Sequence, residues 1–335
     1  MPPIRLISAS AALLLVLAGC TTESTESSGE GGDTPSSAGA DTSAPADGGS
    51  ATDTDTDATG AAQDFPVTVE SSAGAITLDE APQQIVSLSP SATEILYAIG
   101  AGDQVVAVDS YSTYPEGTPV TDLSGFDPNV EAITGYEPDL VVVANDANDL
   151  VASLGELDIP VYVNAAPADI EGGYAGIADL GVLTGHVDQT AQTVATIRDE
   201  VDAALAKAPE APVRVYHELD DTYFSASSYG FVGSVYEALG ATNIADEADA
   251  DQTGFPQLTE EAIIAADPEV IVITDQVDYT EQDVADRPGW QDITAVREGN
   301  IVTVDADIAS RWGPRMPQFI DAAAQALSTA AVPAG

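Results

Sequence analysis

The chain has few of the residue types that common catalytic and metal-binding sites require. It contains one cysteine and two histidines among 335 residues. One cysteine cannot form an internal disulfide, and two histidines are fewer than zinc or manganese sites typically use as ligands. The sequence also has no Gly-rich phosphate loop and no G-x-S-x-G motif. We therefore expect no catalytic residue, no bound metal and no cofactor.

Positive charge is equally scarce. Lys and Arg together number 8, against 56 Asp and Glu, so the formal net charge is −48. An acidic surface of this kind opposes binding to nucleic acid and to anionic lipid headgroups. We interpret the excess of acidic residues as an adaptation to high salt, where self-repulsion is screened.

The N-terminus has the composition of a processed leader followed by a tether. A short apolar run over residues 11–18 ends in the sequence LAGC, which is typical of a bacterial lipoprotein signal. This predicts a signal peptide over residues 1–19 and lipidation of Cys20. Residues 20–64 are rich in Ser, Thr, Gly, Ala and Asp, so we expect a disordered acidic tether that buries little surface.

The remainder alternates β-like apolar runs with helical patterns. Strands are expected at 84–89, 104–108, 139–144, 159–164 and 213–219. Alternation of strands and helices is typical of parallel sheets that are covered on both faces. In the first predicted helix, Ser91 and Glu94 have the spacing of a capping box.

One helical segment differs from the others in its length. From residue 186 to about 207 apolar positions recur at helical spacing without Gly or Pro; they are Val187, Ala191, Val194, Ile197 or Arg198, Val201 and Leu205. This predicts an N-terminal α/β lobe over 65–185, a connecting helix over 186–208 and a C-terminal α/β lobe over 209–335. The expected fold is therefore two similar lobes with mainly parallel sheets, joined by one long helix, with a ligand cleft between them.

The two halves also share a sequence pattern. Residues 130–143 (VEAITGYEPDLVVV) align without gaps on residues 260–273 (EEAIIAADPEVIVI), so that Glu131 corresponds to Glu261. A Gly-Phe pair precedes each segment, at Phe126 and at Phe255. The pattern supports an internal repeat of one structural unit.

Several long stretches resemble the substrate-binding lipoproteins of bacterial ABC importers for cobalamin, ferric siderophores and haem. The stretches are residues 85–115, 129–144, 254–274 and 287–315, and the vitamin B12-binding members are the most similar. The resemblance implies a monomer without enzymatic activity, anchored by its lipid to the outer face of the cytoplasmic membrane. It also implies delivery of the ligand to a permease dimer with its ATPase subunits. A ligand-sensing surface lipoprotein without a transporter is the alternative from a different functional class.

The resemblance also implies roles for individual residues. The ligand-contacting positions would be Tyr111, Phe126, Phe224, Phe255, Asp307, Arg311 and Trp312. Trp312 could equally be a core residue, and Arg315 is expected to be structural and paired with an acid. The transporter-docking residues would be Glu131 and Glu261, with Glu260 as the nearest alternative. Each of these glutamates would also be stabilised by the dipole of its own helix.

Charge favours some ligands over others. Ferric catecholates are strongly anionic, yet only Arg311 and Arg315 are expected near the cleft. We therefore expect cobalamin or a related corrinoid first, and a ferric hydroxamate or haem second. The segment of His217, Glu218 and Asp221 lies at the end of a predicted strand, so it lacks the helical His-x₃-His arrangement of a zinc protease.

Overall fold

The structure, a computed structural model, describes residues 63–330. The predicted signal peptide, Cys20, the predicted tether up to residue 62 and residues 331–335 lie outside the described residues.

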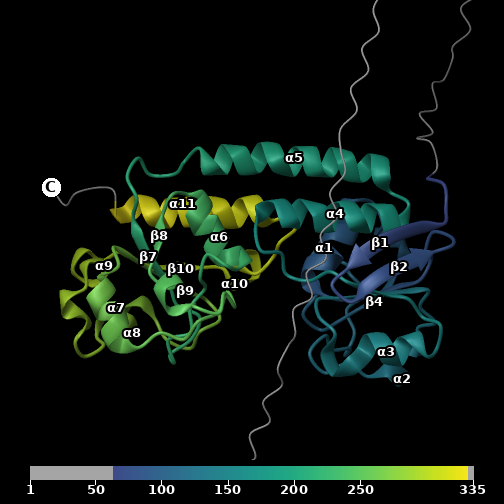
Figure 1. Cartoon of the computed structure of the whole chain (residues 1–335), viewed down its shortest axis with the longest axis horizontal. Coiled ribbons are helices and arrows are strands. Elements are labelled where there is room, and N and C mark those ends of the chain that lie inside the picture. The colour runs from purple at the N-terminus through teal and green to yellow at the C-terminus, as the bar shows by residue number, and fades with distance from the viewer. Residues whose placement is uncertain (1–62, 331–335) are drawn as a thin grey trace, which may run out of the picture. The chain divides into compact units, whose positions relative to one another are not determined.

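Two four-stranded parallel sheets organise the protein (Figure 1). The N-terminal lobe is built on β3 (Ile85–Leu88), β4 (Val105–Val108), β5 (Leu140–Val143) and β6 (Val161–Val163), in the spatial order β4-β3-β5-β6. The C-terminal lobe is built on β7 (Arg214–His217), β8 (Thr242–Asn243), β9 (Val270–Thr274) and β10 (Ile301–Val304), in the order β8-β7-β9-β10. In each sheet the first strand in the chain lies between the second and the third. The predicted fold, two similar α/β lobes, is confirmed.

Helices connect the strands and cover the sheets. In the N-terminal lobe they are α1 (Pro90–Ala98), α2 (Val130–Thr134), α3 (Leu150–Gly155) and α4 (Ile170–Thr184). In the C-terminal lobe they are α6 (Phe231–Ala238), α7 (Glu260–Ala266), α8 (Glu281–Ala285), α9 (Thr294–Glu298), α10 (Ala306–Ala309) and α11 (Met316–Ala330). An antiparallel hairpin of β1 (Val67–Ser71) and β2 (Gly74–Leu78), which the sequence analysis did not predict, packs on α4.

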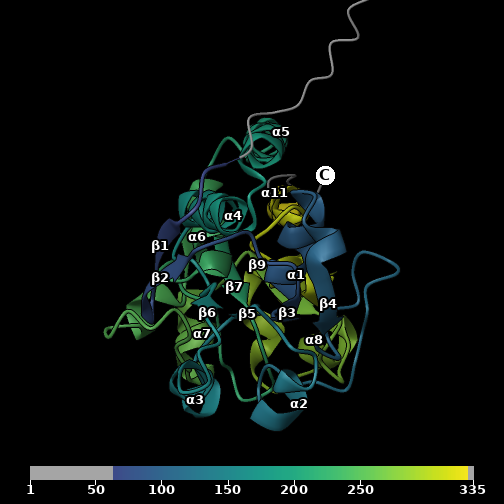
Figure 2. The same ribbon diagram turned by 90° about the vertical axis from the view of Figure 1, so that its right-hand side faces the viewer.

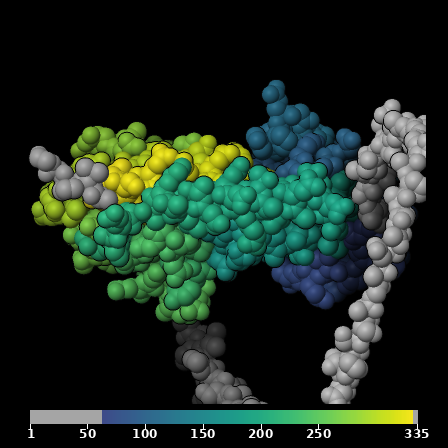
Figure 3. Space-filling view, turned by 90° about the horizontal axis from the view of Figure 1, so that it is seen from above, coloured from purple at the N-terminus to yellow at the C-terminus, as the bar shows by residue number. Residues whose placement is uncertain are grey.

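The long helix α5 (Val187–Leu205) connects the two lobes. Its 19 residues span about 28 Å at 1.5 Å per residue. Figure 2 shows α4, α5 and α11 on one side of the sheets, and Figure 3 shows α11 running alongside α5.

The buried face of α5 agrees with the predicted apolar row in part. Ile197 and Val201 are buried, and Val194 and Leu205 pack against the core. Thr190 and Ala204 are also buried, whereas Val187 is 42% exposed. The packing partners of α5 are α4 and α11.

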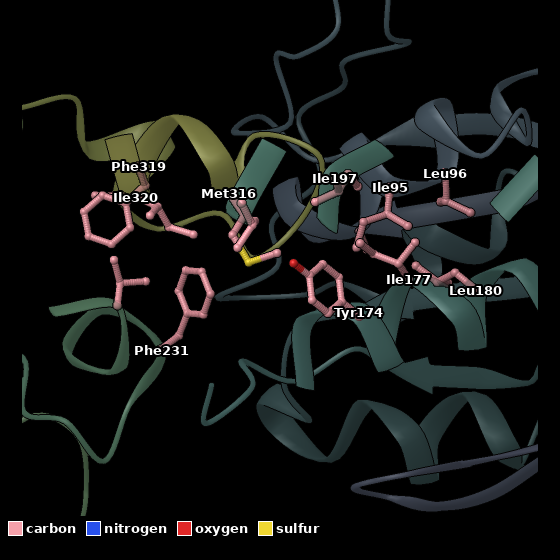
Figure 4. Packing of buried hydrophobic residues seen from close by; sticks show 14 of the residues in the cluster. Ile95, Leu96, Tyr174, Ile177, Leu180, Ile197, Phe231, Met316, Phe319 and Ile320 are labelled. Atoms are coloured by element: carbon pink, nitrogen blue, oxygen red, sulfur yellow. The ribbon is translucent and has the colours of Figure 1, made fainter. Parts of the chain in front are cut away.

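The main hydrophobic core crosses from one lobe to the other. Figure 4 shows Met316, at the start of α11, between Tyr174 of α4 and Phe231 of α6. Gly173 of α4 lies against Met316, since a Cβ added there would be in van der Waals contact with the Met316 sulfur at 3.6 Å. The start of α11 therefore packs against the N-terminal lobe, and α5 is not the sole connection between the lobes among the described residues.

An ion pair lies at this junction. Arg315 donates hydrogen bonds from Nε and Nη2 to the two carboxylate oxygens of Glu94, at 2.8 and 2.5 Å. The Glu94 side chain is 2% exposed and that of Arg315 is 13% exposed. The expectation that Arg315 pairs with an acid thus agrees with the structure.

The predicted capping box is wrong. The N-cap of α1 is Ser89, whose hydroxyl accepts from the backbone N–H of Ala92, while Ser91 lies inside the helix. The carboxylate of Glu94 is used by Arg315 instead of by the helix end.

We predict that Arg315→Met lowers the free energy of unfolding by about 3 kcal/mol, because it leaves the Glu94 carboxylate buried with a weaker partner. Denaturant unfolding measures this. Lys207→Met is the matched control: it breaks a pair with Asp321 in which the lysine is 57% exposed, and should cost less than about 1 kcal/mol. Equal effects of the two substitutions would contradict a special role for the buried pair.

Candidate ligand-binding site

Large aromatic side chains stand exposed on a loop of the N-terminal lobe that follows β4. Tyr111 is 58% exposed and Phe126 is 75% exposed, and their rings meet edge to face with centroids 5.8 Å apart. The Ser124 hydroxyl accepts hydrogen bonds from the backbone N–H groups of Phe126 and Asp127, which fixes the local turn. Large aromatic side chains that stay exposed to water, despite the unfavourable free energy of hydrating them, are typical of a binding surface.

The C-terminal lobe presents a second aromatic surface. Phe224 is 38% exposed and Phe255 is 53% exposed. They lie on two segments joined by backbone hydrogen bonds, from Ser225 N to Pro256 O at 2.9 Å and from Leu258 N to Tyr223 O at 3.0 Å.

Two further aromatic side chains are exposed in loops and were not predicted from the sequence. Tyr229, next to Gly230, is 44% exposed, and Tyr114, whose ring lies under the Arg315 guanidinium at 4.5 Å, is 48% exposed. Each of these tyrosines lies beside Gly or Pro in a loop, and this sequence feature could have predicted their exposure.

The two lobes meet at a small void that contains the predicted arginine. It is too narrow to hold a water molecule and is lined by Pro90, Glu94, Tyr111, Ser112, Thr113, Tyr114, Asp307, Arg311 and Arg315. Residues of both lobes thus surround one space, and Tyr111, Asp307 and Arg311 are brought together there.

Arg311 is already bound to protein groups. It donates from Nη2 to Asp307 at 2.7 Å and from Nη1 to the Ser310 hydroxyl at 2.6 Å, and its side chain is 12% exposed. Its Nε is buried 3.7 Å from Glu94 and has no hydrogen-bond partner among the described residues. A direct contact with ligand stays a prediction.

Trp312 differs from the other predicted ligand residues. It is partly buried and packs against the core that joins the lobes. Its indole N–H is buried without a partner among the described residues. The structure therefore supports the core-packing alternative for this residue.

The two predicted docking glutamates occupy equivalent positions. Asn129 caps α2 by accepting from the N–H of Ala132, and Thr259 caps α7 by accepting from the N–H of Ala262. Glu131 and Glu261 are therefore both the second residue of a capped helix, and both are exposed.

The neighbouring acid behaves differently. Glu260 accepts a hydrogen bond from the indole N–H of Trp290 at 3.0 Å, which ties its carboxylate to the protein. This favours Glu261 over Glu260 as the residue free to meet a partner.

The chain matches the model of the periplasmic binding protein family over residues 85–308. The chain belongs to this family. It is 38% identical over 266 residues to a cobalamin-binding protein of Halobacterium salinarum, a match that covers 75% of this chain and 71% of the relative. It is 32% identical to an uncharacterized ABC transporter substrate-binding lipoprotein of Bacillus subtilis, with 78% and 86% covered.

Comparison with a solved structure also places the chain in this fold. The periplasmic heme-binding protein RhuT of Roseiflexus sp. RS-1, in its apo form, superposes with a TM-score of 0.67 at 26% identity. The match covers 75% of this chain and 99% of that one. The family is one of substrate-binding proteins, and the solved relative has the two-lobed fold described above.

The histidine-containing segment at the end of β7 makes its contacts within this periplasmic binding protein. His217 Nδ1 lies 2.8 Å from the Tyr236 hydroxyl, and burial lowers the pKa of His217 to about 4. Glu218 is bound by Arg287 through two hydrogen bonds of 2.6 and 2.7 Å. Among the described residues there is no group of three or more His, Cys, Asp and Glu that could hold a metal ion.

The buried His217 leads to a prediction about pH. Its folded-state pKa is below the unfolded value of 6.5, so below pH 6.5 the unfolded chain binds a proton that the folded protein does not. Stability from this residue is therefore full above pH 6.5 and is lost as the pH falls towards 4. We expect the stability difference between the wild type and His217→Gln to shrink by up to about 1.4 kcal/mol per pH unit in this window. Denaturant unfolding across the window measures it, and a constant difference would contradict the prediction.

Proposed function

We propose that this protein captures cobalamin or a related corrinoid outside the cytoplasmic membrane and delivers it to an ABC importer. The name of the Halobacterium salinarum relative, at 38% identity, supports the ligand, and the name of the Bacillus subtilis relative supports the transporter. The role involves no catalytic step, and no cofactor is part of it other than the transported ligand.

One observation carries the choice of ligand. Both arginines at the void between the lobes are already paired with carboxylates, Arg311 with Asp307 and Arg315 with Glu94. An anionic ligand would have to compete with these carboxylates for the guanidinium groups. A neutral ligand that is rich in amides and apolar surface would not.

The exposed aromatic residues supply the rest of the site. The void between the lobes is too narrow even for a water molecule, so we propose that the corrin macrocycle lies outside it, against the aromatic surfaces of both lobes. Phe126 and Tyr111 would contact it from the N-terminal lobe, and Phe224 and Phe255 from the C-terminal lobe. Arg311 would donate a hydrogen bond from its guanidinium to an amide carbonyl at the edge of the ring.

The proposed cellular arrangement follows the sequence and the family. Cys20 would carry the lipid, residues 20–64 would hold the protein at the outer face of the cytoplasmic membrane, and the protein would act as a monomer. Glu131 and Glu261 would each meet a basic pocket of the permease dimer, which works with its ATPase subunits. No helix among residues 63–330 is long and apolar enough to cross a membrane.

The ligand can be tested by calorimetric titration of the lipid-free Cys20→Ser protein with cyanocobalamin, a ferrioxamine and haemin in parallel. We expect cyanocobalamin to bind with a Kd below about 10 μM and the others to bind more weakly. Phe255→Ala should weaken cyanocobalamin binding about tenfold, because stacking area is lost.

The control for this substitution is Tyr136→Ala, which removes an aromatic ring that is 37% exposed but follows α2 on the docking side of the repeat. It should leave the affinity unchanged. Tight binding of ferrioxamine or haemin with no response to cyanocobalamin would replace the proposed ligand with one of the alternatives.

Docking is tested by charge reversal. Glu131→Lys and Glu261→Lys should each lower uptake of labelled cyanocobalamin at least tenfold while leaving the Kd for ligand unchanged. The basic pocket of the transporter would repel the introduced lysine. Glu200→Lys, on the exposed face of α5, is the matched control and should have no effect on uptake. Unchanged uptake in both docking variants would favour a sensing lipoprotein that works without a transporter.

A further inference from the structure

A ribbon of irregular backbone carries the aromatic surface of the C-terminal lobe. It consists of residues 222–228 and 253–258, which run antiparallel and are joined by the hydrogen bond from Ser227 N to Gly254 O at 3.0 Å in addition to those given above. Side chains along it alternate as in a strand, since Gly254 and Pro256 are buried while Phe255 and Gln257 are exposed. Phe224 pairs with Gln257 across the ribbon.

One buried carboxylate binds both segments of this ribbon. Asp249 is 4% exposed. Its Oδ2 accepts from the Ser227 hydroxyl at 2.6 Å and from the Gly254 N–H at 2.8 Å. Its Oδ1 accepts from the N–H and the hydroxyl of Thr253 at 2.8 and 3.0 Å. Four donors from the two segments therefore converge on one side chain directly beside Phe255.

The turn held by Asp249 is one that the backbone does not favour alone. Gln252 has φ of +54° and Gly254 has φ of +83°. A Cβ on Gly254 would lie 3.2 Å from the Cα of Gly230, so the turn also packs tightly against the loop of Tyr229. Left-handed backbone at a non-glycine residue costs free energy, which the surrounding contacts must supply.

The charge of Asp249 suits this task. Burial raises the pKa of Asp249, but the hydrogen bonds from Ser227, Thr253 and Gly254 together outweigh it and hold the pKa below its usual range. The side chain is therefore a carboxylate at neutral pH and can accept all four hydrogen bonds, whereas an amide in its place would present N–H groups to some of these donors.

We propose that Asp249 is a positioning residue for the ligand, which sets the affinity by holding Phe255 in its exposed, ligand-facing orientation. The inference rests on the proposed function, because Phe255 must contact the ligand. The N-terminal lobe fixes Phe126 differently, through the Ser124 hydroxyl.

A double-mutant cycle on the Kd for cyanocobalamin, measured by calorimetry on the lipid-free full chain, separates positioning from general stability. We expect Asp249→Asn to weaken binding about tenfold in the wild-type background. In the Phe255→Ala background the same substitution should change the Kd less than about twofold, because the ring that it positions is gone. In the Phe126→Ala background the tenfold effect should persist.

A purely structural role would give the same loss of affinity in all three backgrounds, and that result would overturn the proposal. Ser227→Ala removes one of the four donors and should weaken binding a few-fold, so the proposal stays testable if Asp249→Asn does not fold. An unchanged Kd in a folded Asp249→Asn or Ser227→Ala protein also overturns it.

Failure of the inference and failure of the proposed function give different results. If the wild type does not bind cyanocobalamin, the proposed function fails and the inference fails with it. If the wild type binds and Phe255→Ala weakens binding while Asp249→Asn does not, the inference alone is wrong.

Discussion

The contact between Glu94 and Arg315 constrains the rest of the structure. It joins residues that are 221 positions apart, one in the first helix of the N-terminal lobe and one at the start of the last helix. Both side chains are nearly buried, so either charge without its partner would carry a large desolvation cost. Met316, next to Arg315, extends the hydrophobic core across the same junction. The two lobes are therefore held together by α5 and by this second contact, which lies beside the candidate site.

The internal repeat explains how a candidate ligand surface and a candidate docking surface fit on one scaffold. In each lobe an exposed Phe is followed within six residues by an exposed Glu in the first turn of a capped helix. The ring and the carboxylate therefore belong to one short segment, with the ring in the loop and the carboxylate on the helix. The equivalence extends to the residue before each following proline, since Glu137 and Asp267 both have positive φ, at +51° and +47°. A single loop-and-helix unit, used twice, thus presents both a candidate ligand surface and a candidate docking surface.

Local patterns in the sequence predicted the features that depend on neighbours in the chain. The apolar runs became strands because a parallel strand is buried on both faces, and the 130-residue shift between Glu131 and Glu261 matched two helices with the same cap. Features that depend on distant partners were missed or wrong. Glu94 has the spacing of a capping residue, but its partner is in the last helix. Thr190 of α5 is buried because it packs on Gly181 of α4. No local sequence pattern distinguishes Asp249 from the other acidic residues, because only the folded ribbon brings its four hydrogen-bond donors together.

The central claim is that the two lobes form one rigid pair that holds the ligand without a large closing motion. Spin labels at Ala152→Cys on α3 and Gln282→Cys on α8, both exposed positions, can be placed specifically because Cys20 is the only native cysteine and can be replaced by serine. Electron–electron distance measurements with and without cyanocobalamin should give distributions whose maxima differ by less than about 2 Å. A shift of several ångströms on ligand binding would show a hinge between the lobes and would contradict the account.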